Sequence, residues 1–200
     1  MNIGGVNFNI NGGDVTIDNN FFKTFTSLKH LRILETNSIT VGKEQFKDMK
    51  SLIDVVFSSK SNINLNDSCF SGSGINEIAL MSNQKIIIEN NCFENCLSLN
   101  SFIVQKGLDL KLGNFVFHNC PLLSNIDFNI IRKISISNFG FNKCQSIISL
   151  SIYANEIVIG NNCFEECSNL EKVILNASLY LKVTDFCFAN AKKINSVILS

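Results

Sequence analysis

The stretch Ile157–Leu175, IVIGNNCFEECSNLEKVIL, decides the fold because its residue pattern repeats eight times along the chain. Its anchor is Phe164, and phenylalanines stand at the equivalent place in the other copies: Phe22, Phe46, Phe70, Phe93, Phe117, Phe141 and Phe188. The steps between successive anchors are 24, 24, 23, 24, 24, 23 and 24 residues. A fixed period of this length predicts a solenoid, in which each unit packs only on its neighbours.

Each copy, or unit, predicts two short strands joined by a turn. Two apolar residues separated by one open the unit, as in Ile157 and Ile159, which is typical of an extended segment. Apolar or small residues three and six places after the anchor predict a tight helical turn facing the core. A closing strand follows, with inward residues such as Val173 and Leu175, and successive strands should stack in parallel.

A short polar residue stands three places before the anchor in all units but one. These residues are Asn19, Asp67, Asn90, Asn114, Asn138, Asn161 and Asp185, and Lys43 is the exception. Asn and Asp side chains accept hydrogen bonds from the free N–H groups at the start of a helical turn. The pattern therefore predicts that each of them caps the anchor turn of its own unit.

No linker or charge block divides the chain, which predicts one solenoid domain over residues 15–200. Residues 1–14 contain Val6, Phe8 and Ile10 in alternation with Asn, which predicts an N-terminal strand or a partial repeat.

Two places depart from a regular array. In the third unit, Ser71-Gly72-Ser73-Gly74 replaces the core-facing turn and one residue is missing, so we expect a local weakness or bend. The chain stops directly after the strand residues Val197 and Leu199, which predicts an uncapped C-terminal end. The chain is then either a fragment of a longer array or has this end covered by a partner, and self-association through open solenoid ends is one such cover.

Composition argues against several classes of function. Seventeen basic and 17 acidic residues balance, and no basic cluster predicts a nucleic-acid partner. No apolar run is long enough for a transmembrane helix. The N-terminal segment lacks the features of a signal peptide, which favours a cytoplasmic protein, with the cell surface as the alternative.

Eight cysteines occupy two positions of the repeat. Cys69, Cys92, Cys163 and Cys187 precede an anchor directly, and Cys96, Cys120, Cys144 and Cys167 follow one by three places. Phe, Met, Ser or Ala fills the second position in other units, which favours Cys as a small buried side chain. Zinc is disfavoured because no second ligand pair follows, whereas a disulfide between stacked cysteines is an open alternative. We expect no metal and no cofactor.

The sequence predicts no enzyme. His30 lies on the outward side of a closing strand, and His118 follows Phe117 at a position expected to be exposed. The two are far apart in the repeat frame, and no Ser/His/Asp or Cys/His set can be assembled on one face. No phosphate-binding loop is present.

The closing strand, Leu-x-x-[Val/Ile/Leu]-x-[Leu/Ile/Phe], is the strand signature of leucine-rich repeats. The fuller unit, Ile-x-[Ile/Val]-x-x-x-Cys-Phe-x-x-Cys-x-x-Leu-x-x-Val-x-Leu, resembles the BspA-type subclass. Ile157–Leu175 carries it in full, and Ile86–Val104 carries it with Phe102 and Val104 at the last two positions. The resemblance covers residues 15–199. The Asn that many such repeats place after the closing strand appears only at Asn83 and Asn155, so the backbone groups there need other partners.

The resemblance implies a right-handed superhelix of about eight repeats of 23–24 residues. A parallel sheet would form its inner face, with short 3₁₀ or α turns and short strands on the outer side. It also implies a protein-binding role, since members of the subclass occur as surface adhesins and inside cells.

The outward residues of the closing strands are the candidate binding surface. Their middle row is Arg32, Val56, Ala79, Ile103, Asp127, Ser151, Ile174 and Ile198. Five of these eight residues are apolar, although a solvated face should be polar. The row either stabilises neighbouring strands by cross-strand contact or forms an interaction patch with a polar rim. The candidate partner-binding residues are Arg32, Val56, Ile103, Asp127, Tyr153, Lys172 and Ile174.

We therefore expect a non-enzymatic scaffold that binds a protein partner through the inner sheet. The alternative is a structural or adhesive cell-surface repeat module.

Overall fold

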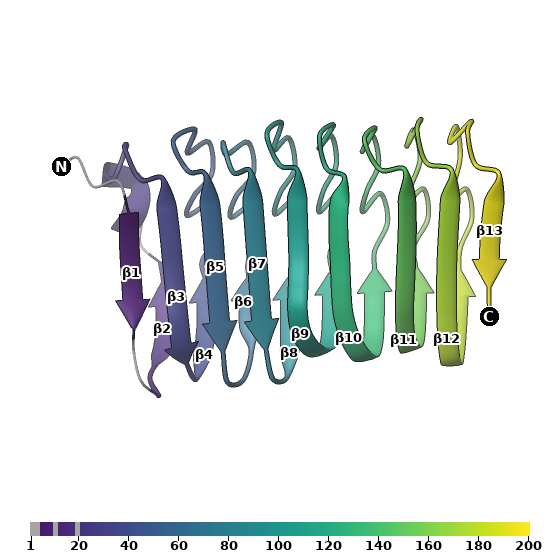
Figure 1. Cartoon of the computed structure of the whole chain (residues 1–200). Helices are drawn as coiled ribbons and strands as arrows, with labels where there is room; N and C mark the ends of the chain where they lie inside the picture. Colours follow the sequence, from purple (N-terminus) through teal and green to yellow (C-terminus); the bar gives the residue numbers. More distant parts are fainter. Residues whose placement is uncertain (1–4, 10–11, 19–20) are drawn as a thin grey trace.

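The computed structural model describes residues 5–9, 12–18 and 21–200, so the expectations for Ile10 and Asn19 lie outside the described residues. The chain is a β-solenoid in which two layers of parallel strands stack along one axis, with the first strand at one end and the last strand at the other (Figure 1). The predicted repeat solenoid, with a parallel sheet on one side and short strands on the other, is confirmed.

The inner sheet, the layer nearer the viewer in Figure 1, is built from the closing strands. In spatial order these are β1 (Gly5–Asn9), β3 (His30–Thr36), β5 (Asp54–Ser59), β7 (Glu77–Ser82), β9 (Ser101–Leu112), β10 (Asn125–Ile136), β11 (Ser149–Ile159), β12 (Lys172–Val183) and β13 (Ser196–Leu199). The outer strands are β2 (Asp14–Ile17), β4 (Ser38–Val41), β6 (Ile63–Leu65) and β8 (Lys85–Ile88). Beyond β8 the outer layer continues as the second halves of β9 to β12, which bend from one layer into the other (Figure 1).

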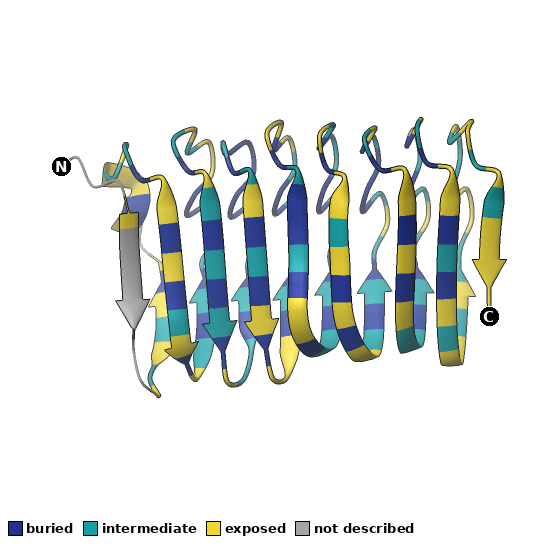
Figure 2. Ribbon diagram, in the orientation of Figure 1, coloured by how far each residue is buried: buried dark blue, intermediate teal, exposed yellow. Residues whose placement is uncertain are grey.

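The register of the sheet stacks equivalent residues of successive units. Leu31, Val55, Ile78 and Phe102 stand opposite one another in neighbouring inner strands, and all four are buried. Buried residues alternate with exposed or half-buried ones along β3, β5, β7 and the first halves of β11 and β12 (Figure 2). The core therefore extends along the array. Each fully buried aliphatic or aromatic side chain contributes about 1.5–3 kcal/mol to the stability of the fold.

The anchor phenylalanines form a ladder through that core. From Phe46 to Phe188 neighbouring ring centroids lie 4.9–5.6 Å apart, with interplanar angles of 3° to 18°. Phe22 joins the end of the ladder at 5.2 Å from Phe46, tilted by 36°. Aromatic pairs at such distances add to the stability gained from burial alone.

The anchor turn differs between the first unit and the later ones. In the first unit it is the 3₁₀ helix η1 (Phe21–Thr24). In the fourth, the N–H groups of Asn91, Phe93 and Asn95 donate to carbonyls of the fifth unit at 2.8–2.9 Å. Asn91 and Asn95 have φ values of 57° and 58°, and the same two positions are left-handed in the other later units. This backbone directs alternate N–H groups towards the next unit, whereas a helix would use them internally.

The polar residues three places before the anchor link successive units. Their Oδ1 atoms accept the backbone N–H of the equivalent residue one unit later: Asp67 from Asn90 (3.0 Å), Asn90 from Asn114 (2.9 Å), Asn114 from Asn138 (3.1 Å) and Asn138 from Asn161 (2.9 Å). The prediction of a cap within each unit is wrong for this run. The anchor N–H, three places after the polar residue, already donates to the following unit, so the side chain meets its neighbour's backbone instead.

The third unit stays in line with the array. Ile75, Ile78 and Leu80 are buried despite the missing residue, and β7 pairs in parallel register with both β5 and β9. Its backbone passes close to the second unit, because a Cβ on Gly74 would overlap the Lys50 carbonyl. The expected bend is therefore absent from the described residues of this unit, and the expected weakness stays a prediction.

Among the described residues, the inner sheet has one interruption in its pairing. β10 and β11 pair over Lys133–Ile136 and Glu156–Ile159, but no pairing joins Asn125–Phe128 to Ser149–Ile152. These two strands also stand farther apart than their neighbours in the inner layer (Figure 1). The outward face consequently has a first segment, on β3 to β10, and a second segment, on β11 to β13.

Candidate functional site

The outward middle row of the inner sheet is aligned by the register. In the first segment Arg32 stands opposite Val56, and the row continues through Ala79 and Ile103 to Asp127. In the second segment Ser151, Ile174 and Ile198 stand opposite one another. The structure thus brings four of the seven candidate residues, Arg32, Val56, Ile103 and Asp127, into one row. The other three lie beyond the interruption.

The centre of the first segment is apolar. Val56, Ala79 and Ile103 are all half-buried, and Met81 is exposed at 36% beside them. A hollow of about 210 Å³ lies here, lined by Leu34, Glu35, Val56, Phe57, Ser58, Ala79, Leu80, Met81 and Gln105. Because the small Ala79 stands between two β-branched residues, it leaves a low point in the row. Such a hollow can accept one apolar side chain of a partner.

The first segment begins at a polar cluster that the sequence reasoning missed. His30 Nδ1 is hydrogen-bonded to Asp54 Oδ2, and Arg32 Nη2 lies 3.8 Å from Asp54 Oδ1. Asp54 Oδ1 is buried and has no hydrogen-bond partner among the described residues. The signal was available, since His30 and Asp54 occupy the same place in units 24 residues apart. The cluster offers a charged rim beside the apolar centre.

The second segment carries the remaining candidates. Tyr153 is 56% exposed and stands opposite Asn176, Lys172 is exposed, and Ile174 is half-buried opposite Ser151. An exposed tyrosine is a residue type enriched in protein interfaces. This segment is smaller than the first and has a different chemistry.

The cysteines three places after the anchors form hydrogen bonds with backbone carbonyl groups. The thiols of Cys96, Cys120, Cys144 and Cys167 donate to the carbonyl of the anchor phenylalanine one unit earlier, at 3.0–3.1 Å. All eight cysteines are buried and free, as the packing interpretation predicts. Burial raises the pKa of Cys96 and of Cys167 to about 12, so these thiols are poor nucleophiles. The described part of the chain holds no cluster of three or more His, Cys, Asp or Glu suited to a metal ion.

His118 departs from its expected position. The side chain is half-buried rather than exposed, and its ring centroid lies 5.7 Å from that of Phe115 in an edge-on arrangement. Its Nδ1 is buried without a hydrogen-bond partner among the described residues. Phe115 fills a left-handed position of the turn, with φ of 53°, and this places its ring against the imidazole.

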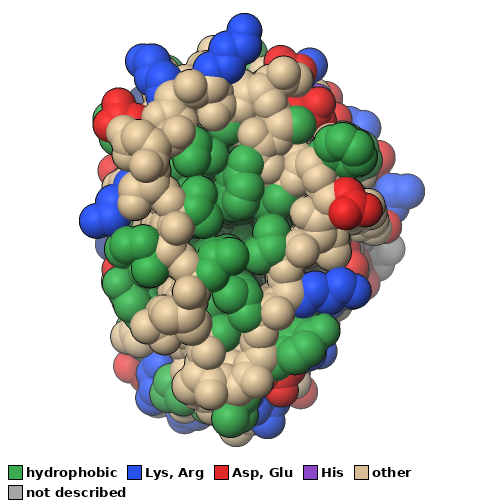
Figure 3. All heavy atoms as spheres, turned by 90° about the vertical axis from the view of Figure 1, so that its right-hand side faces the viewer, with side chains coloured by type: hydrophobic (Ala, Val, Ile, Leu, Met, Phe, Trp, Pro, Cys, Tyr) green, Lys and Arg blue, Asp and Glu red, His purple; other side chains and the backbone are tan. Residues whose placement is uncertain are grey.

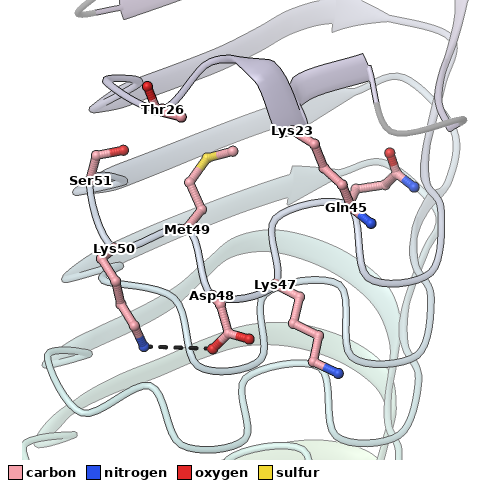
Figure 4. A pocket seen from close by; sticks show the side chains of 8 residues that line it. All are labelled: Lys23, Thr26, Gln45, Lys47, Asp48, Met49, Lys50 and Ser51. Atoms are coloured by element: carbon pink, nitrogen blue, oxygen red, sulfur yellow. Dashed lines mark ion pairs between the residues drawn. The ribbon is translucent and has the colours of Figure 1, made fainter.

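A separate hollow of about 290 Å³ lies over the turns of the first two units (Figure 4). It is lined by Lys23, Thr26, Gln45, Lys47, Asp48, Met49, Lys50 and Ser51. Lys50 Nζ lies 3.7 Å from Asp48 Oδ1 and Lys47 Nζ lies 3.2 Å from Glu44 Oε1, so two of the three lysines are paired with carboxylates. The hollow therefore lacks the concentrated positive charge of an anion site.

Comparison with known proteins identifies the same repeat. The family model described as "BspA type Leucine rich repeat region (6 copies)" matches residues 6–100 and 86–200. Comparison with the curated proteins finds no matching sequence. Among solved structures, a leucine-rich cell surface protein from Faecalibacterium prausnitzii is similar at 13% identity, covering 100% of this chain and 88% of that one, with a TM-score of 0.32. No helix among the described residues is long and apolar enough to cross a membrane.

Proposed function

We propose that this chain, which belongs to the BspA-type leucine-rich repeat family, is a non-enzymatic scaffold that binds a protein partner through the outward face of its inner sheet. The observation that carries the proposal is the row Val56, Ala79 and Ile103, whose apolar side chains keep a share of their surface in solvent. A solvated sheet face would place polar residues there.

The surroundings of this row favour a protein as the partner. Arg32, His30 and Asp54 lie at one end and Asp127 at the other, so an apolar centre is flanked by charged residues of both signs. This is the anatomy of a protein interface, with a desolvated centre and a polar rim. The balance of 17 basic and 17 acidic residues gives no reason to expect nucleic acid.

A matched pair of substitutions tests the face. Ile103→Lys places a charge in the centre of the row, and Ile87→Lys makes the same change at a half-buried position of the outer strand β8. We expect Ile103→Lys to abolish capture of partners from native lysate and Ile87→Lys to retain the same set of partners. Both variants must keep the parent's circular dichroism spectrum and urea midpoint. Equal capture by both variants would remove the inner face from consideration.

The second segment is tested separately because the interruption divides the face. Ile174→Lys and Tyr153→Ala change only the segment on β11 to β13. If one partner spans the whole face, either variant weakens its capture. If the second segment takes no part, capture stays at the parent's level and the site shrinks to β3 to β10.

A structural or adhesive cell-surface module is the second function that we test. The expectation of a cytoplasmic protein gains no support from the family match. Protease added to intact cells distinguishes the two placements, since a surface module is cleaved and a cytoplasmic scaffold is protected. A lysed sample, in which both are cleaved, is the control.

We also propose that a second copy covers the C-terminal end of the solenoid. Apolar side chains gather in the middle of that end face, within a ring of backbone atoms and other side chains (Figure 3). Val197 and Leu199 are 43% and 54% exposed, whereas Val173 and Leu175, one unit earlier, are fully buried. Light scattering should show association that Leu199→Lys removes. A parent chain that stays monomeric at high concentration would overturn this proposal.

A further inference from the structure

The cysteines directly before the anchors behave differently from those after them. Cys69 and Cys92 belong to the third and fourth units, and their Sγ atoms lie 3.1 Å apart in the core. Non-bonded carbon atoms, for comparison, rest roughly 3.5–4.0 Å apart. A thiol pair at this distance is in direct contact, with nothing between the two sulfur atoms.

The backbone geometry suits a bond between them. The Phe70 N–H donates to the Cys92 carbonyl at 2.9 Å, so the two chain segments lie side by side. Stacked segments about 4.8 Å apart fall within the Cα separation that a disulfide spans, roughly 4.4–6.8 Å. The sulfur atoms need to approach by about 1 Å to reach the bonded distance of about 2.05 Å.

The sequence places these cysteines in matched pairs. Cysteine precedes the anchor in the third and fourth units and again in the seventh and eighth, as Cys163 and Cys187. The remaining four units carry Phe21, Gln45, Val116 and Gly140 at this position. A merely small buried residue has no need of an equal neighbour. The cysteines after the anchors, by contrast, direct their thiols at carbonyl oxygens.

We propose that Cys69 and Cys92 form a disulfide that joins the third and fourth units, with a low-molecular-weight disulfide such as oxidised glutathione as the oxidant. The thiolate of one cysteine attacks the glutathione disulfide, which gives a mixed disulfide and releases one glutathione thiolate. The second cysteine thiolate attacks the protein-bound sulfur and releases the other glutathione. Two electrons pass from the cysteine sulfurs to the oxidant, and the two released thiolates take up the two protons.

The oxidant reaches the two cysteines either when the third unit opens or while the chain is still folding. Both side chains are fully buried in the folded state, and burial raises the pKa of Cys69 well above its ordinary value. The folded pair therefore reacts slowly, because the thiolate is the attacking species. The neighbouring Ser71–Gly74 contains two glycines, which lose more conformational entropy on folding than other residues. A bond between the two units would hold this segment in place.

Peptide mapping after refolding tests the proposal. The full chain is unfolded, refolded in glutathione redox buffers, and blocked with an alkylating reagent. Trypsin cleaves after Lys60 and Lys85, so Cys69 is the only cysteine of its peptide. A glutamate-specific protease then cuts after Glu94 and separates Cys92 from Cys96. We expect a linked Cys69–Cys92 peptide in oxidising buffer and its loss on adding dithiothreitol.

Variants and stability provide the controls. Cys92→Ser should abolish the linked peptide, and Cys120→Ser, which lacks a stacked thiol contact of this kind, should retain it. The oxidised parent should unfold at a higher urea concentration than the reduced one, with no such shift in Cys92→Ser. Eight free thiols in the parent under every buffer would overturn the proposal. Linkage of Cys69 to any cysteine other than Cys92 would also overturn it. The same peptide map shows whether Cys163 and Cys187 are linked.

Discussion

Removing one ring from the anchor ladder should cost more in the middle of the array than at its end. Phe117 is fully buried, with its ring centroid 5.3 Å from Phe93, 5.0 Å from Phe141 and 4.7 Å from Phe102. Truncating such a residue to Ala costs about 3–5 kcal/mol. The stacked contacts supply about 0.5–1.5 kcal/mol each within that figure.

The same change at Phe188 is the matched comparison. Phe188 stacks only on Phe164, at 5.6 Å, and is half-buried. Without a second stacked neighbour and with part of the ring in solvent, Phe188→Ala should cost at least about 1 kcal/mol less than Phe117→Ala. Urea unfolding followed by circular dichroism measures both, provided that the m-values agree with the parent's.

A double-mutant cycle shows whether the ladder itself carries the energy. Phe117→Leu, Phe141→Leu and the double variant keep an apolar side chain at each position while removing one ring–ring contact. We expect a coupling free energy of about 0.5–1.5 kcal/mol between the two positions. Equal costs for Phe117→Ala and Phe188→Ala, together with zero coupling, would refute the reasoning.

Three further predictions concern the backbone and the thiols. Asn114→Ala removes the acceptor of the Asn138 N–H and should cost about 0.5–1.5 kcal/mol in urea unfolding, whereas Asn114→Asp retains the acceptor and should cost less. Burial raises the pKa of Cys96 to about 12, above the value of about 8.5 expected in the unfolded chain. The contribution of this thiol to stability should therefore be constant at neutral pH and fall as pH rises above about 8.5. The urea midpoint should decline less steeply between pH 7 and 10 in Cys96→Ala than in the parent. Hydrogen exchange should be faster in Ser149–Ile152 than in the matching part of β9, because β11 lacks one inner neighbour there, and equal protection would contradict the interruption.

The sequence was sufficient for the architecture because one residue type marks each unit. The anchor phenylalanines set the period, and the alternation after each of them identifies the inward residues, such as Leu31 and Val55, that stack in the observed register. Both signals are local and repeat eight times, so they reinforce one another.

The hydrogen bonds between units were not predictable in the same way. Asn114 and its equivalents have the composition of helix caps, and a residue type does not reveal whether its partner lies in its own unit or in the next. The answer depends on the left-handed backbone two places either side of each anchor from Phe46 onward, where Phe115 and Lys143 stand in some units and Asn in others. Bonding between units selects that conformation.

The candidate site was predicted only in part. The register shows that Val56 and Ile103 share one row with Ala79, but the unpaired halves of β10 and β11 separate them from Tyr153 and Ile174. No residue type in β10 or β11 predicts this interruption of the pairing. The binding roles of these residues stay predictions until the Ile103→Lys and Ile174→Lys variants are compared.

The bonds between anchor turns give this one strip of the solenoid an electrical direction. From the second unit onward, three N–H groups per unit donate towards the C-terminal end, so their peptide dipoles add along the axis as they do in an α-helix. The last of these donors are the N–H groups of Phe186, Phe188 and Asn190, which meet no acceptor among the described residues. The C-terminal end is therefore the positive pole of the strip. The second copy proposed to cover this end would therefore bind best if it presented carbonyl or carboxylate oxygens as well as apolar surface.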